Sequence, residues 1–221
     1  MKAKEPAGNP ESIDLRCELS WRHALRFPLQ SKAARRDLFI GGLWLLVPVF
    51  GWLLNMGHRI RVVHRLQRGE EPWPAWGAPG ELLLHGCWTF LGMAFYGAPG
   101  LALIGLGWWG AQPLLSALGG GVLLLAIIAI PGYMSHYCRA YDRREIFDPR
   151  RALSRVRQGG AAYWRAWSYV IPTMLLSLLG LPLLVVGFVW TSVWFWQVAA
   201  FCFATVFTQR FDLDGGHLEG R

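Results

Sequence analysis

Asp142 and Glu145 are the carboxylates whose spacing comes closest to a reactive site, because they stand three residues apart in a stretch expected to be helical. Two carboxylates at this spacing share one helix face, where they could hold a divalent ion for phosphate transfer to a lipid. Arg139, Arg143 and Arg144 surround them. Neighbouring guanidinium groups favour surface ion pairs over a metal, so we interpret both carboxylates as ion-paired surface groups.

Histidine and cysteine offer no further reactive constellation. His58 and His64 are six residues apart and so face different sides of a helix, which does not make a metal pair; we interpret them as solvated histidines at the membrane interface. The cysteines are widely separated and form no CxxC or CxxH pattern, so we expect small buried hydrophobic residues rather than disulfides or zinc ligands. They are Cys17, Cys87, Cys138 and Cys202.

Known catalytic motifs are also missing from the sequence. It contains no P-loop, GxSxG, HExxH or paired-aspartate lipid-transferase pattern. We therefore expect a protein that is not an enzyme and that carries no cofactor and no metal.

Composition indicates what surrounds these residues. Hydrophobic residues make up 53% of the 221-residue chain and the mean hydropathy is +0.28, which favours a membrane protein over a soluble one. The net charge is +8. Because the arginines cluster beside apolar runs, anionic lipid headgroups are the expected partner, and nucleic acid is not.

Two long uncharged runs predict two helical hairpins. Leu82 to Cys138 contains no Asp, Glu, Lys or Arg in 57 residues, and Ser168 to Gln209 contains none in 42. Each run is long enough for two membrane helices and a turn. We place the first turn at Trp108 to Pro113 and the second near Gly187 to Ser192, with tryptophans at the interface.

The first apolar segment leaves two alternatives open. Leu38 to Met56 is uncharged over 19 residues, roughly 28 Å of helix, or about one hydrocarbon core. Pro48 interrupts this segment, and basic residues stand on both sides of it. A kinked full span would put one basic bank outside, against the positive-inside rule, whereas a re-entrant hairpin would keep both inside.

The remaining segments connect these runs. Ile13 to Trp21 alternates like a strand, but we favour an amphipathic helix through Trp21 and Phe27 that ends at Pro28. Asp148-Pro149 predicts the start of a short helix lying on the bilayer, which ends at Gly159-Gly160. Trp73 and Trp76 are expected to be interfacial anchors. Helix breaks or distortions are expected at Pro48, Pro99, Pro172 and Pro182.

Together these elements predict an all-α integral membrane protein with two helical hairpins, an N-terminal proline-broken membrane segment and basic interfacial helices. A polar tail (1–19) would precede a helical membrane domain (20–210), and a second tail would follow it (211–221). The apolar segments are about 38–56, 82–109, 113–135, 168–187 and 191–209. We expect a multi-pass protein of the bacterial inner (cytoplasmic) membrane.

Short motifs in a fixed order resemble one family. They are Ala24 to Leu29, Lys32 to Arg36, Gly41-Gly42, Val47 to Gly51, Gly57, Gly69, Pro74-Ala75-Trp76, Gly86, Pro99, Pro149 to Tyr163 and Thr208-Gln209. This order is similar to that of the uncharacterised bacterial and archaeal multi-spanning family filed as domain of unknown function 4013, over about Ser20 to Gln209. His58 departs from the tyrosine common there. The resemblance implies a membrane-embedded helical domain and carries over no catalytic residue.

The one-sided charge and the missing catalytic patterns lead to a functional expectation. We expect a non-enzymatic accessory or scaffolding subunit of a membrane complex, with a membrane-protein partner or a second copy of itself. Its cytoplasmic basic face would bind anionic lipid or the partner through Arg35, Arg36, Arg59, Arg61, Arg65, Arg68, Arg139, Arg143, Arg144, Arg150, Arg151, Arg155 and Arg157. The alternative is a passive channel or small-solute permease built on proline-broken helices.

Overall fold

The fold was obtained as a computed structural model that describes residues 13–182 and 186–213. Most of both predicted tails therefore lies outside the described residues, as do residues 183–185 of the predicted segment 168–187. The described chain is helical and contains no strand. Its elements are α1 (Trp21–Arg26), the 3₁₀ turn η1 (Phe27–Leu29), α2 (Lys32–Leu45), α3 (Phe50–Gln67), α4 (Pro79–Trp109), α5 (Pro113–Ala140), the 3₁₀ turn η2 (Arg143–Glu145), α6 (Pro149–Leu178) and α7 (Val186–Phe211). The predicted fold class is confirmed.

The first apolar segment folds back on itself. A turn at residues 46–49 separates α2 from α3, and Val49 in this turn has φ 65°. Asn55 Nδ2 of α3 donates to the carbonyl oxygen of Gly41 in α2 at 3.0 Å. A Cβ on Gly51 would overlap the carbonyl of Trp44, so glycine permits this close return. The helical ladder stops at Pro48, which lacks the required N–H.

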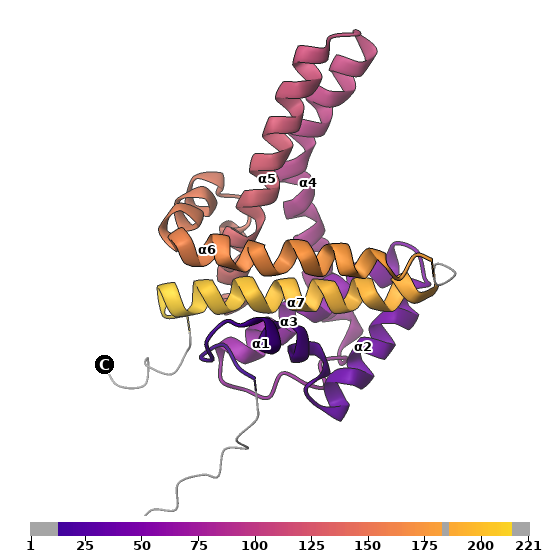
Figure 1. Ribbon diagram of the computed structural model, residues 1–221, viewed down its shortest axis with the longest axis vertical. Coiled ribbons are helices and arrows are strands. Elements are labelled where there is room, and N and C mark those ends of the chain that lie inside the picture. The colour runs from indigo at the N-terminus through magenta and orange to yellow at the C-terminus, as the bar shows by residue number, and fades with distance from the viewer. Residues whose placement is uncertain (1–12, 183–185, 214–221) are drawn as a thin grey trace, which may run out of the picture.

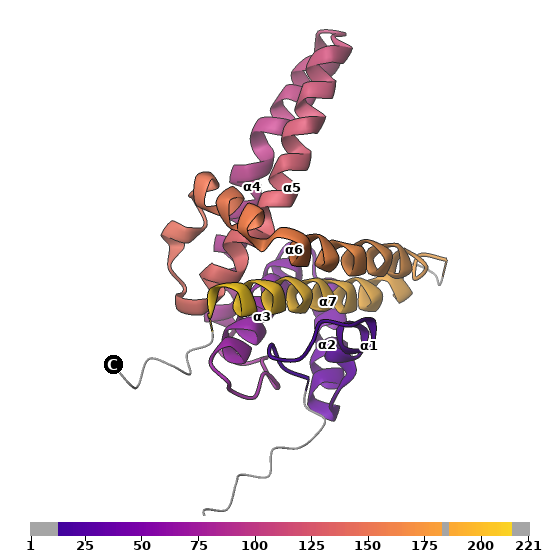
Figure 2. The same cartoon turned by 60° about the vertical axis from the view of Figure 1, so that its left-hand side comes forward.

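The α4–α5 hairpin projects from the rest of the molecule, as Figures 1 and 2 show. Its turn at residues 110–112 lies where the sequence predicts it. The helices approach closely where a Cβ on Gly119 would lie 2.7 Å from the carbonyl oxygen of Gly100. Pro99 lies inside α4, which continues through it, because one proline removes only one ladder hydrogen bond.

The α6–α7 hairpin lies across the base of the first one (Figure 1). Asp148 caps α6 by accepting from the backbone N–H of Arg151 at 3.0 Å, and α6 bends at Gly160, where φ is 53°. The sequence predicts the end of a helix there, and the helix direction does change. Pro172 lies within α6 without ending it.

Two details of the second hairpin correct the prediction. Its turn precedes the predicted Gly187 to Ser192, since α6 ends at Leu178 and α7 already begins at Val186. Pro182 is therefore outside α6 rather than inside it. The Ser177-Leu178-Leu179-Gly180 stretch ends the helix before the proline is reached, in accordance with the bias against helix just before proline.

The N-terminal segment packs along α7. The Phe27 and Phe201 rings stack with centroids 4.4 Å apart, and Gln209 Nε2 donates to the carbonyl oxygen of Leu15 at 2.9 Å. Residues 13–20 are irregular, and α1 follows with Ser20 as its N-cap. The favoured helix is therefore present, and the alternating pattern before it does not form a strand because no neighbouring strand is available to pair with it.

Within residues 13–182 and 186–213, three helices are long and apolar enough to cross a membrane: α4, α5 and most of α7. The apolar surface of the first two is largely uncovered, with the Trp109 side chain at the hairpin tip 93% exposed. A soluble protein rarely exposes an apolar surface of this extent. These helices are those of a membrane protein.

Candidate functional site

The structure separates the predicted basic face into three groups of arginines. The exposed ones are Arg35, Arg36, Arg68, Arg143, Arg144, Arg150, Arg151 and Arg157, and the half-buried ones are Arg65, Arg139 and Arg155. Arg59 and Arg61 are buried. The last two therefore cannot belong to an exposed basic face, which corrects the prediction. They are covered because α3 contacts α2, α4, α5 and α7.

Arg61 and Arg65 hold the loop between α3 and α4. Arg61 forms an ion pair with Glu81 at 2.8 Å and also donates to the carbonyl oxygen of Gly77. Arg65 donates to the carbonyl oxygen of Pro74 at 2.6 Å. Both guanidinium groups thus satisfy carbonyl groups in a loop that has no regular structure of its own, which is a structural role.

The carboxylate pair near η2 is used in capping and ion pairing. Asp142 accepts from the backbone N–H of Arg144 at 2.9 Å, and Glu145 pairs with Arg155 at 2.5 Å and with Arg151 at 3.5 Å. The partners of Glu145 thus come from the following helix and not from the arginines beside it in sequence. The described residues contain no group of three or more His, Cys, Asp or Glu side chains placed to hold a metal ion.

The most buried polar cluster joins α2, α3 and the loop before α4. Asp37 is 1% exposed, and its Oδ2 accepts from His58 Nε2 at 3.0 Å and from the backbone N–H of Ala75 at 2.6 Å. The His58 ring stacks on Trp76 with centroids 4.2 Å apart and also contacts Trp73. Burial lowers the pKa of His58, against an opposing effect of Asp37.

This cluster overturns the interpretations of its members. His58 is not a solvated interfacial residue, and Trp73 and Trp76 are not lipid anchors: Trp73 is buried, and Trp76 Nε1 donates to the backbone carbonyl of Asp37 at 2.8 Å. Asp37 is not among the predicted site residues. Its position at the edge of the first apolar segment, one residue before Leu38, is a signal that could have identified it, since a carboxylate there needs a partner.

The predicted burial of the cysteines is correct for two of them, whereas Cys17 and Cys87 are only half-buried. All four thiols are free, and Cys138 and Cys202 are buried. His64 is half-buried and donates from Nδ1 to the carbonyl oxygen of Cys138 at 2.6 Å, so it too is more enclosed than an interfacial histidine.

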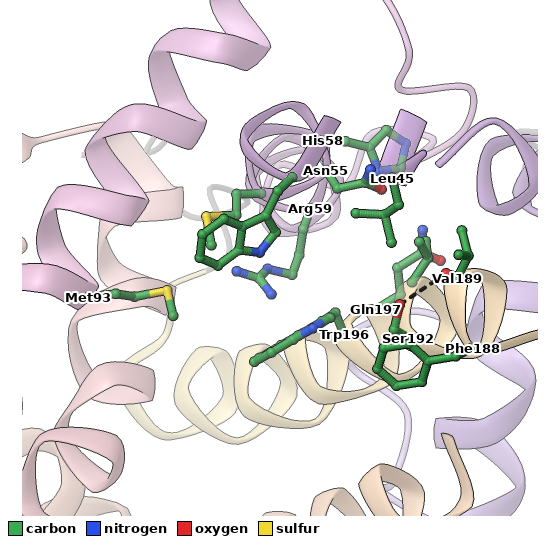
Figure 3. Close-up of a pocket in the computed structure, with 13 residues that line it drawn as sticks. Leu45, Asn55, His58, Arg59, Met93, Phe188, Val189, Ser192, Trp196 and Gln197 are labelled. Atoms are coloured by element: carbon green, nitrogen blue, oxygen red, sulfur yellow. Dashed lines mark hydrogen bonds between the residues drawn. The ribbon is translucent and has the colours of Figure 1, made fainter. Parts of the chain in front are cut away.

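Arg59 lies at a cavity of about 390 Å³ between α3 and α7. Figure 3 shows its side chain extending toward Trp196, whose ring centroid is 5.0 Å from the guanidinium carbon. Asn55, His58, Ser192 and Gln197 are other polar residues that line this cavity. Among the described residues Arg59 has neither a carboxylate within 4.0 Å nor a hydrogen bond, and its Nε is buried without a partner. Burial lowers the pKa of Arg59, yet a guanidinium group stays charged in proteins.

A second cavity of about 310 Å³ adjoins the first at Arg59, Met93 and Trp196. Its walls are apolar side chains of α3, α5, α6 and α7, among them Ile130, Met134, Val170 and Phe203. The buried charge of Arg59 therefore stands where a partly polar cavity meets an apolar one.

Comparison with protein families gives one match. The family described as "Protein of unknown function (DUF4013)" matches residues 40–208, which is most of the chain. The chain belongs to the DUF4013 family. No curated protein and no solved structure matches it. The matched DUF4013 region includes α3, all but the last three residues of α7, and both cavities, so the Arg59 site lies within the family domain.

Proposed function

We propose that this DUF4013 protein is a non-enzymatic, multi-pass accessory subunit of the bacterial cytoplasmic membrane, whose exposed arginines bind anionic lipid headgroups at its cytoplasmic side. The observation that supports this proposal is a set of accessible arginines without counter-charges. Within the described chain, no ion pair or hydrogen bond engages the side chains of Arg35, Arg36, Arg139, Arg144, Arg150 or Arg157.

The position of these arginines supports the proposal. Arg139 is near the end of α5, and Arg144, Arg150 and Arg157 follow in η2 and the first part of α6. That part of α6 buries Ala152 against α5 and exposes its arginines. An arginine near an anionic membrane surface contributes about 1 kcal/mol of attraction, so several together suffice for measurable headgroup binding.

The α2–α3 hairpin also supports a cytoplasmic location for the basic residues. Because the chain folds back at residues 46–49, Arg35 and Arg36 near the start of α2 and Arg65 and Arg68 near the end of α3 lie toward the same end of the hairpin. A re-entrant segment with both basic banks on the cytoplasmic side satisfies the positive-inside rule. Surrounding helices would shelter the irregular backbone at the turn.

The test measures lipid preference in detergent-purified protein by native mass spectrometry. We expect more phosphatidylglycerol than phosphatidylcholine bound at equal concentration, and a smaller excess in 0.5 M salt, which screens exposed charges. Replacing Arg144, Arg150 and Arg157 together with glutamine should reduce the excess. Replacing them with lysine should preserve it, because headgroup attraction needs the charge and not the guanidinium fork. Equal binding of both lipids to the native protein would refute the proposal.

The features that support the permease alternative are the predicted helix breaks at Pro48 and Pro182, both of which lie outside the helices. The other two predicted breaks, Pro99 and Pro172, lie inside continuous helices and expose no broken segment. A solute flux into liposomes above that of empty vesicles would replace the accessory function with this alternative.

A further inference from the structure

The Arg59 guanidinium is an unpaired charge inside the protein. Arg59 is 7% exposed, and the only group that compensates its charge within the described residues is the face of Trp196. An aromatic face attracts a cation but accepts no N–H hydrogen bond as a carboxylate or phosphate does. A buried charge without a hydrogen-bonding counter-charge is costly, so the site is incomplete without an anion.

A second side chain at the cavity lacks partners as well. Gln197 is 3% exposed, and neither its Nε2 nor its Oε1 has a hydrogen-bond partner in the described structure. The neighbouring polar groups are satisfied: Asn55 donates to Gly41 and Gly51, and Ser192 donates to Val189. Among the described side chains that line the cavity, those of Arg59 and Gln197 are therefore the ones that hold a buried polar atom without a hydrogen-bond partner.

The adjoining apolar cavity determines what kind of anion fits. The two cavities meet at Arg59, Met93 and Trp196, and beyond them the lining residues of the second are almost entirely hydrocarbon, sulfur and aromatic groups. Its volume of about 310 Å³ lies within the range of about 300–1,000 Å³ found for small-molecule sites. A small inorganic anion would leave this cavity empty, and an uncharged hydrocarbon would leave Arg59 unpaired.

We propose that the paired cavities bind an anionic amphiphile of the membrane, with its carboxylate or phosphate accepting from Arg59 and Gln197 and an acyl chain in the apolar cavity. This site is separate from the headgroup-binding surface, because Arg59 is enclosed by α3 and α7 while the surface arginines are exposed. The binding is noncovalent, and one amphiphile occupies each chain.

Binding can be measured on the full-length protein in a mild nonionic detergent by native mass spectrometry. The probes are oleate, a single-chain phosphatidylglycerol, a single-chain phosphatidylcholine and inorganic phosphate. We expect one tightly held copy of an acidic amphiphile per chain, and at least about tenfold weaker binding of the phosphatidylcholine and of phosphate, which lack the net charge and the chain respectively. Whether oleate or the phosphatidylglycerol binds more tightly identifies the headgroup.

Variants assign this binding to the cavity. Arg59→Gln should weaken the tight copy at least about tenfold, which corresponds to losing one charge-assisted contact, and Gln197→Leu should weaken it less. The matched control is Arg150→Gln on the exposed part of α6, which should leave the tight copy unchanged. Ala200→Phe, which places a ring at the apolar cavity, should weaken oleate binding while Arg59 remains in place.

The binding results for these variants distinguish the cavity from the exposed arginines. Loss of the tight copy in Arg150→Gln but not in Arg59→Gln would overturn the cavity proposal and leave headgroup binding at the surface intact. Equal binding of the acidic and zwitterionic amphiphiles to the native protein would also overturn it. If Arg59→Gln does not fold, as judged by circular dichroism, Gln197→Leu and Ala200→Phe decide: unchanged binding in both refutes the site.

Discussion

Replacing Asp37 with alanine tests whether the buried polar cluster stabilises the fold. The substitution removes the acceptor for two buried donors, the backbone N–H of Ala75 at 2.6 Å and Nε2 of His58 at 3.0 Å. Each buried donor left without a partner costs about 1–3 kcal/mol, so the two together cost about 2–6 kcal/mol. The other carboxylate oxygen, Oδ1, has no partner, and removing its desolvation places the expected loss in the lower half of that range.

A matched substitution distinguishes the hydrogen bonds from the charge. Asp37→Asn keeps an oxygen where both donors point and places the amide nitrogen at the unpaired Oδ1 position, so we expect a loss of about 1 kcal/mol. Asp142→Ala serves as the surface control, because that exposed carboxylate accepts a single hydrogen bond within the described chain, from the backbone N–H of Arg144. Losing such a cap typically costs about 1 kcal/mol.

The measurement is the free energy of unfolding of purified protein in mixed micelles, followed by tryptophan fluorescence and circular dichroism as denaturing detergent is added. All three variants are compared at the same micelle composition. The expected order of stability is native, Asp142→Ala and Asp37→Asn close together, then Asp37→Ala. An Asp37→Ala protein within about 0.5 kcal/mol of the native one, the range of ordinary surface substitutions, would refute the reasoning.

Two further predictions concern single positions. Gly119→Ala should destabilise the α4–α5 hairpin, because its Cβ would lie 2.7 Å from the carbonyl oxygen of Gly100. A Cβ at Gly120 would have nothing within 4 Å, so Gly120→Ala should be neutral or stabilising by up to about 1 kcal/mol through helix propensity. Thermal unfolding of the two variants checks this difference. Burial, with a contribution from Asp14, raises the pKa of the Cys17 thiol to about 11 from 9.0. Alkylation of Cys17 at pH 8 should therefore be about 100-fold slower than that of an ordinary thiol, and its rate should rise about tenfold per pH unit. A rate at pH 8 equal to that of a free cysteine would contradict this, and Cys17→Ser provides the blank.

The uncharged runs predict the helices well, because the absence of charge and the length of a run are the features that identify a membrane helix. The turn after Trp109 and the return at Pro48 follow from residues whose backbone chemistry is local, proline and glycine above all. The second turn was placed too late because Gly187 lies in a uniformly apolar run, where local sequence does not distinguish a turn from the first turn of a helix. Tertiary packing of α6 on α7 decides that boundary.

The site residues were harder to predict because they depend on contacts between distant segments. Asp37 meets His58 only after the chain reverses at residues 46–49, and Trp76 reaches both from a loop beyond α3. In sequence, Arg59 belongs to the same basic run as Arg68 and reads as another headgroup contact. Nothing in that run shows that α3 will be covered by four other helices, so burial of its charge could not be read from the pattern.

The central helix α3 contributes to both the buried Asp37–His58 cluster and the cavity at Arg59. A helix surrounded on several sides needs partners for its polar side chains within the protein, and α3 has them at three positions: His58 with Asp37, Arg61 with Glu81, and Asn55 with the Gly41 carbonyl at 3.0 Å. Arg59 departs from this series, since it has no such partner in the described chain. Three satisfied neighbours argue that the fold can supply partners to α3 where it needs them. The unpaired charge then belongs to a position kept open for a ligand, because the described residues supply no anion to complete it.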